Sequence, residues 1–177
     1  MSKEAEVFLP ITEPNTSINE LLEIISNIYL NGGALFYSFK VENIKIFDNV
    51  AEVPEYIEKI IIHKEVLPVL TDLEIEPPLK MKLNFKKINI TDFKVQLVSN
   101  LMEGGAYSEY VEGLSKLTRI VEDACDSLFK KQINEVKVFY SSSAWSEWFG
   151  DMNWDSTWFF FDKARRKMYI LCVTDMD

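Results

Sequence analysis

Residues 157–173, TWFFFDKARRKMYILCV, decide the fold, because two apolar segments here flank the short polar connection Lys163–Arg166. Pairing Asp162 with Lys167 sets opposite charges across the ladder of a β-hairpin and predicts its register. In that register Trp158, Phe160, Tyr169, Leu171 and Val173 share one face, and Phe159, Phe161, Met168, Ile170 and Cys172 share the other. Because both faces are apolar, we expect the hairpin to lie centrally in a sheet that is covered on both sides.

The remaining chain alternates helix and strand signals. Amphipathic periodicity predicts helices that begin near Ser17, Pro54, Thr91 and Ser108. Residues 34–41, 79–85 and 135–140 favour strands, as 44–47 and 87–95 also could. The lysines that alternate along 79–85 place that strand towards a sheet edge. These elements predict an α+β fold, with three to four helices packed on a mainly antiparallel sheet, and a single globular domain over residues 1–177.

The composition narrows the kinds of partner. A net charge of -9 argues against a nucleic-acid partner, because phosphates are bound by clustered Lys and Arg. No segment is apolar and long enough for a membrane span, and the N-terminus lacks the apolar region of a signal peptide, so we expect a cytoplasmic protein with no membrane partner. Cys125 and Cys172 lie among apolar neighbours and are expected to be reduced core thiols.

No catalytic or cofactor-binding motif of recognised spacing is present, so no catalytic residue and no cofactor is predicted. The single histidine, His63, follows the buried side of a predicted helix and is expected to be structural. Asp151, Asn153, Asp155 and Asp162 have the spacing of an EF-hand loop, but Ser156 replaces its glycine and the last positions read as a strand. No metal site is therefore predicted.

All four tryptophans and several carboxylates lie in or near residues 145–162. If the hairpin pairing continued past residue 157, Trp154 would lie opposite Asp175, and the acidic side chains near both segments would gather at one end of the sheet. However, because side chains alternate between the two faces of a sheet along each strand, Asp155 and Asp175 would point to opposite faces. The candidate partner-binding residues are Trp145, Trp148, Asp151, Trp154, Asp155, Asp175 and Asp177.

Exposed tryptophan beside carboxylates is typical of protein interfaces. The leading hypothesis is a binding protein that masks a basic protein partner, because the acidic composition is similar to the general profile of bacterial immunity and antitoxin proteins, which mask basic toxin enzymes. Trp154→Ala and Asp175→Ala are then expected to weaken partner capture without unfolding the protein. The alternatives are an enzyme that uses paired carboxylates on a sugar or a metal-bound substrate, and a homo-oligomer that covers one hairpin face.

Overall fold

A computed structural model describes residues 7–52, 55–79, 81 and 83–177. Its centre is a six-stranded antiparallel sheet with the strand order β1-β2-β6-β5-β4-β3. The strands are β1 (Phe8–Pro10), β2 (Gly33–Val41), β3 (Lys86–Ile88), β4 (Val136–Ser141), β5 (Ser156–Asp162) and β6 (Lys167–Thr174). The α-helices are α1 (Thr16–Ile28), α2 (Lys45–Glu52), α3 (Tyr56–Ile61), α4 (Ile90–Glu103) and α5 (Leu114–Phe129).

The predicted hairpin and its register are confirmed. Strands β5 and β6 pair from Ser156↔Val173 to Asp162↔Lys167 and occupy the two central positions of the sheet. Asp162 also accepts a hydrogen bond from the guanidinium of Arg165 at 2.8 Å, within the turn. The α+β class is confirmed as well.

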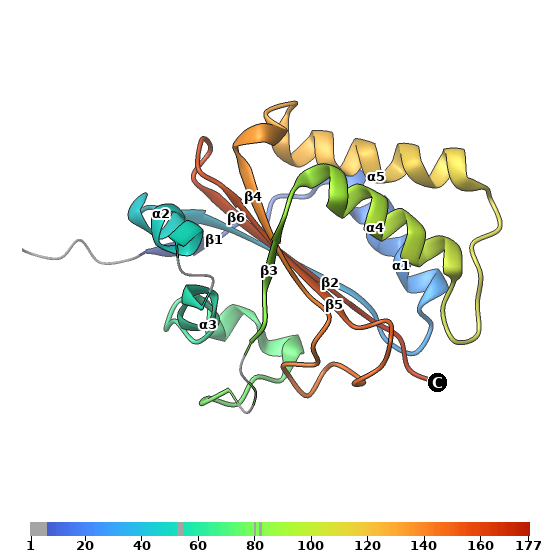
Figure 1. Cartoon of the computed structure of the whole chain (residues 1–177), viewed down its shortest axis with the longest axis horizontal. Helices are drawn as coiled ribbons and strands as arrows, with labels where there is room; N and C mark the ends of the chain where they lie inside the picture. The colour runs from blue at the N-terminus through green and yellow to red at the C-terminus, as the bar shows by residue number, and fades with distance from the viewer. Residues whose placement is uncertain (1–6, 53–54, 80, 82) are drawn as a thin grey trace, which may run out of the picture.

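Each face of the sheet is buried in a separate apolar layer (Figure 1). Helices α1, α4 and α5 cover one face, where Phe160 contacts the rings of Phe93 and Phe129 at centroid distances of 4.8 and 5.7 Å. Helices α2 and α3 and the loops at residues 66–73 and 144–149 cover the other face. The expected alternation of hairpin residues between the two layers is confirmed, and both faces are covered within the chain itself.

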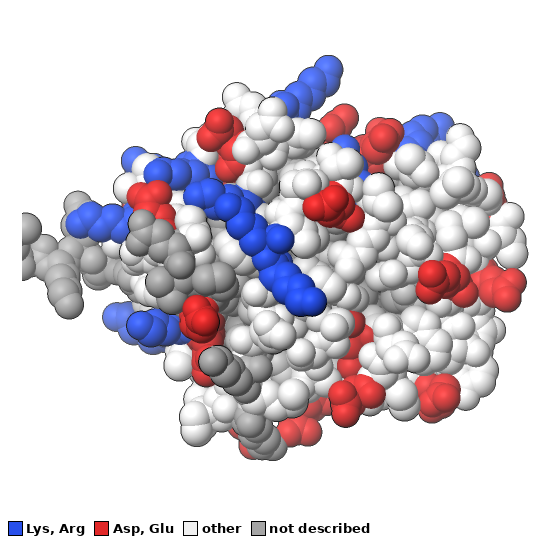
Figure 2. Space-filling model, in the orientation of Figure 1, with Lys and Arg blue, Asp and Glu red and all other residues white. Residues whose placement is uncertain are grey.

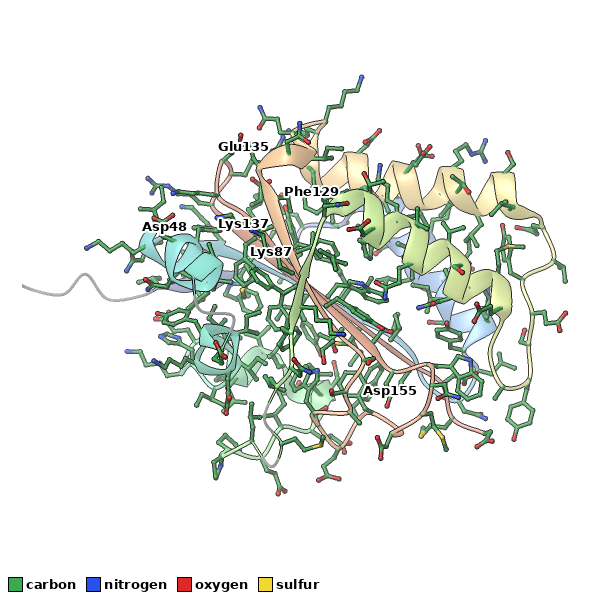
Figure 3. All side chains as sticks on the ribbon, in the orientation of Figure 1. Asp48, Lys87, Phe129, Glu135, Lys137 and Asp155 are labelled. Carbon is green, nitrogen blue, oxygen red and sulfur yellow. The ribbon has the colours of Figure 1, made fainter. Side chains whose placement is uncertain are left out.

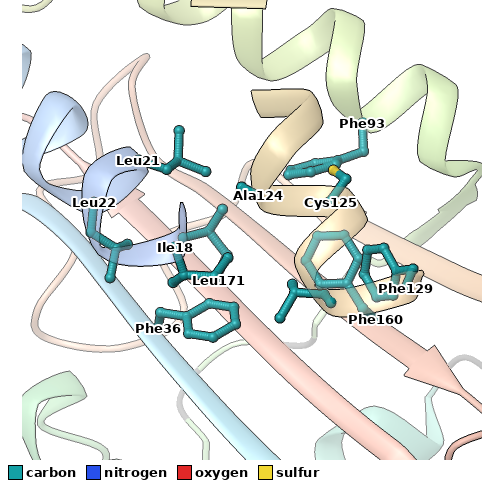
Figure 4. A pocket seen from close by; sticks show the side chains of 11 residues that line it. Ile18, Leu21, Leu22, Phe36, Phe93, Ala124, Cys125, Phe129, Phe160 and Leu171 are labelled. Carbon is teal, nitrogen blue, oxygen red and sulfur yellow. The ribbon is translucent and has the colours of Figure 1, made fainter. Parts of the chain in front are cut away.

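A small cavity of about 20 Å³ remains between α1, α5 and the sheet. Figure 4 shows its lining, which comes from both helices, from Phe93 of α4 and from strands β2, β5 and β6. Every lining side chain is apolar or a cysteine, so the cavity belongs to the core packing.

The structure corrects the prediction of a strand at residues 44–47. Asn43 Oδ1 accepts a hydrogen bond from the Lys45 amide, and helix α2 follows. Ile46, Phe47 and Val50 then point into the second apolar layer at helical spacing. A short apolar segment fits either periodicity, and burial on one side of a helix decides it here.

Helix starts also differ from the prediction. The N-cap residues of α1 and α4 are Asn15 and Asn89, each of which accepts a hydrogen bond from a backbone amide three residues on. Helix α5 begins at Leu114 rather than after Ser108, because Gly113 has a φ of +96° and interrupts the helical backbone. The helix start predicted at Pro54 lies outside the described residues.

The strand predicted at 79–85 is not present in its described part. The sheet edge is instead formed by β3, Lys86–Ile88, directly before α4. The alternative strand assignment of residues 87–95 agrees with β3 only at its first two residues. Lys80 and Lys82 lie outside the described residues. Two 3-10 turns, Leu67–Val69 and Thr71–Leu73, lie in the segment between α3 and β3. No helix of the described chain combines the length and apolarity needed to cross a membrane.

Candidate functional site

The seven predicted site residues divide between the interior and the surface. Trp145, Asp155 and Asp175 are buried, with 4%, 1% and 0% of their surface exposed. The other four are partly or fully exposed: Trp148, Asp151, Trp154 and Asp177. The predicted group therefore does not form one continuous surface.

Asp155 closes the turn that leads into β5. Its carboxylate accepts hydrogen bonds from the Met152 amide at 3.0 Å and from the Thr174 hydroxyl at 2.5 Å. The β5–β6 ladder ends at Ser156↔Val173, so the predicted pairing of Trp154 with Asp175 does not form. Figure 3 shows Asp155 at the end of the sheet far from Asp48.

Asp175 joins three segments that are distant in the sequence. Its two oxygens accept the backbone N–H groups of Asn31 at 3.0 Å and of Ala106 at 2.7 Å. A Cβ on Gly105 would overlap Asp175 Oδ2, so the loop can approach this carboxylate closely only with glycine. Burial, and next the charge of Asp175, raises the pKa of Tyr29 above its ordinary value.

The two buried carboxylates thus have structural partners on different segments. Neither reaches solvent, so neither is placed to act on a substrate or a partner. Because Asp175 holds the α1 and α4–α5 connections together, we now expect Asp175→Ala to lower the stability of the fold, which replaces the expectation drawn from the sequence.

Three of the tryptophans outside β5 have defined contacts. Trp145 donates its indole N–H to the Thr157 hydroxyl at 2.8 Å and packs on Phe149. Trp148 meets the same Phe149 edge-on at 5.1 Å. Trp154 donates to the carbonyl of Gly104 at 3.1 Å, on the other side of the sheet end. Trp145 and Trp148 therefore support the same loop, and Trp154 belongs elsewhere.

That loop forms one wall of a groove of about 220 Å³, which we call the acidic groove. The opposite wall is the segment after the second 3-10 turn. The acidic residues of its lining are Glu74, Glu76, Glu147 and Asp151, and the other lining residues are Leu79, Met81, Ala144, Trp145, Ser146 and Phe149. A second hollow of about 320 Å³ adjoins it and shares Glu74, Glu76 and Glu147. Among the described residues, neither lining includes a Lys or an Arg.

Two of the acidic residues that line the groove have a left-handed backbone conformation. Glu74 has a φ of +52° and Asp151 a φ of +56°. Such non-glycine residues are uncommon, and aspartate tolerates the conformation better than glutamate. The surrounding loops therefore hold both residues in defined positions on the two walls of the groove.

Figure 2 shows acidic side chains along the lower edge of this view, below a row of Lys and Arg that crosses the face over β3 and β4. Of the seven candidates predicted from the sequence, Trp145 and Asp151 line the groove, and its other acidic residues, Glu74, Glu76 and Glu147, were not predicted. The acidic segment Glu74–Glu76 was visible in the sequence, but no local pattern indicates that it lies opposite residues 144–151.

The described residues contain no cluster of three or more side chains that could hold a metal ion. In comparisons with known proteins, no family model, no curated protein and no solved structure matches the chain. The acidic groove is the candidate site on which a function can be proposed.

Proposed function

We propose that this chain is a binding protein whose acidic groove accepts a cationic segment of a partner protein. The observation that carries the proposal is the composition of the groove: its lining combines four carboxylates with apolar side chains, among them Trp145, Phe149 and Met81. Lys and Arg side chains suit such a surface, because their aliphatic stems pack on apolar atoms while their charged ends meet carboxylates.

The two kinds of lining contribute differently. Burial of apolar surface supplies about 25 cal/mol per Å². The carboxylates, together with the net charge of -9, speed association with a basic partner and disfavour acidic ones. Masking of a basic toxin enzyme, as an immunity or antitoxin protein does, is the specific form of this proposal that agrees with the composition.

The candidate residues enter the proposal unequally. Asp151 and the buried Trp145 line the groove, and Trp148 supports it through Phe149. Trp154 and Asp177 are not in its lining. Asp155 and Asp175 contribute by holding the chain segments at this end of the sheet.

The test is affinity capture from the cells that encode the protein, with wild-type protein and the double variant Glu74→Gln/Asp151→Asn as baits. Asparagine is chosen at 151 because it tolerates left-handed backbone. A matched control, Glu122→Gln/Asp123→Asn, removes the same charge from the exposed face of α5.

We expect wild type and control to retain a basic protein at low salt and to release it at high salt, because exposed charge pairs are screened. The groove variant should retain much less of it. Equal retention by all three baits, or capture of no basic protein, would contradict the proposal.

A further inference from the structure

The edge of the sheet at β2 is only partly covered. Strand β1 pairs with β2 from Phe8↔Val41 to Pro10↔Phe39, and the last contact is the Ile11 amide donating to the Ser38 carbonyl at 2.8 Å. The chain then leaves the sheet through residues 12–14 to begin α1 after Asn15. Residues 33–37 of β2 therefore have β6 on one side and no described strand on the other.

The direction of the main-chain groups follows from the ladder. In an antiparallel pair, successive residues point their N–H and C=O groups alternately to the two sides. The Ser38 carbonyl faces β1, whereas the Val41 amide bonds to Arg166 on the β6 side. By the same alternation Ala34 and Phe36 point their main-chain groups to the open side, and no described backbone group outside β2 bonds to them there.

The two edges of the sheet differ in protection. At the opposite edge β3 is short and has exposed Lys86 and Lys87, which are features that discourage pairing with another strand. The open part of β2 includes residues 34–37, with the sequence ALFY, which have no charge and no proline and are half-buried throughout. None of these side chains has a feature that discourages pairing with another strand.

A cleft of about 770 Å³ lies at the end of this open edge where β1 stops. Phe36, Tyr37 and Ser38 of β2 line it together with the connecting residues 10–15, with residues of α1 from one layer and with Val69 from the other. The edge is thus recessed between the two layers. A recess of this kind admits a single extended segment more easily than the sheet of a second folded copy.

The cleft is basic in an acidic protein. Lys130, Arg165 and Lys167 line it, against one acidic residue, Glu13. Arg165 is paired with Asp162, but Lys130 and Lys167 form no ion pair with any residue that the structure describes. Lys167 shares its face of the sheet with Tyr169, whose ring stacks on Phe36 at 6.0 Å.

We infer that the open edge of β2 binds an extended acidic segment of a partner protein by strand addition. The main-chain groups of Ala34 and Phe36 would hold the segment in register, as in other edge-strand recognition. Acidic side chains at alternate positions would face the side that carries Lys130 and Lys167, and apolar ones would face Tyr37 and Val69. This site is separate from the acidic groove and takes a ligand of the opposite charge.

The probe is a short fluorescent peptide in which valine alternates with glutamate, titrated with the whole protein and followed by anisotropy. Two comparison peptides replace glutamate by lysine, or carry N-methyl groups on the amides of alternate residues. We expect the Val–Glu peptide alone to bind well, because lysine meets like charge and N-methylation removes the main-chain donors.

Protein variants separate the two contributions. Ala34→Pro removes an amide that faces the open side and leaves the β6 ladder intact, so peptide binding should fall about tenfold, while Ala34→Val should keep it. Lys130→Gln/Lys167→Gln should weaken binding to a similar extent, and Glu74→Gln/Asp151→Asn should not alter it. Urea unfolding verifies that each variant is folded.

Three results would overturn the inference. The first is equal binding of the N-methylated and unmodified peptides, and the second is unchanged binding by a folded Ala34→Pro variant. The third is self-association of the wild type that Ala34→Pro abolishes, which would assign the edge to a second copy of the chain.

Discussion

Asp175→Ala removes a buried carboxylate whose two oxygens accept backbone N–H groups from Asn31 and Ala106. Hydrogen bonds to a charged group contribute about 1.5–3 kcal/mol each. Asn31 is exposed, so in the variant its backbone amide can form a hydrogen bond with water instead. The lower part of the energy range therefore applies to that hydrogen bond. We therefore expect the free energy of unfolding to fall by about 3 kcal/mol.

The assay is urea unfolding followed by tryptophan fluorescence. With a slope of about 2 kcal/mol per molar urea, a loss of about 3 kcal/mol lowers the midpoint by roughly 1.5 M. Asp175→Asn keeps one acceptor oxygen and should lose less. Asp177→Ala, an exposed carboxylate two residues on, is the matched control and should change stability by no more than about 0.5 kcal/mol.

A loss below about 1 kcal/mol for Asp175→Ala, equal to that of the control, would refute the reasoning. It would show that the two backbone amides find other partners without the carboxylate. Asp175 would then again be a candidate for partner contact, since its removal would no longer disturb the fold.

Three further predictions concern the core. Phe160→Ala should lower the free energy of unfolding by about 3–5 kcal/mol, because Phe160 packs on Phe93 and is 2% exposed. A loss of less than about 2 kcal/mol in urea unfolding would contradict this packing. Tyr37→Phe should raise the same free energy by up to about 1 kcal/mol, since the buried Tyr37 hydroxyl has no hydrogen-bond partner among the described residues; a clear loss in the melt would reveal one. Burial raises the pKa of Cys125 and Cys172 from 9.0 to about 12. The two thiols therefore lose their protons at lower pH in the unfolded chain than in the folded protein, so the free energy of unfolding should fall as the pH rises from about 9 towards 12. In urea unfolding at several pH values, the double variant Cys125→Ala/Cys172→Ala should show a smaller decline. An unchanged decline would show that other groups cause it.

The hairpin shows how far local sequence can predict this fold. Its alternation of apolar residues and the pair Asp162–Lys167 act between neighbouring segments, so periodicity and charge were enough to obtain the register and the central position. The strand prediction at 44–47 failed because its few apolar residues fit a helix equally well. The late start of α5 depends on the positive φ of Gly113, which a helical pattern in side chains does not reveal.

The candidate site was predictable only in part. Trp145 and Asp151 were identified from an aromatic and acidic segment, but the pattern did not distinguish buried from exposed members. Asp155 and Asp175 were predicted at the surface because they are acidic, but both are buried. Their carboxylates accept hydrogen bonds from main-chain N–H groups and, for Asp155, from a hydroxyl. Such partners have no signature in side-chain sequence.

The sequence by itself determined the two-faced hairpin, the α+β class and the acidic balance of the chain, because these follow from short-range periodicity and composition. Only the tertiary structure decided that Glu74 lies across a groove from Asp151. It also decided that β1 ends early and leaves the main-chain groups of Ala34 and Phe36 without a neighbouring strand. Both features depend on where loops distant in the sequence meet, and that meeting is set by the packing of the two layers on the sheet.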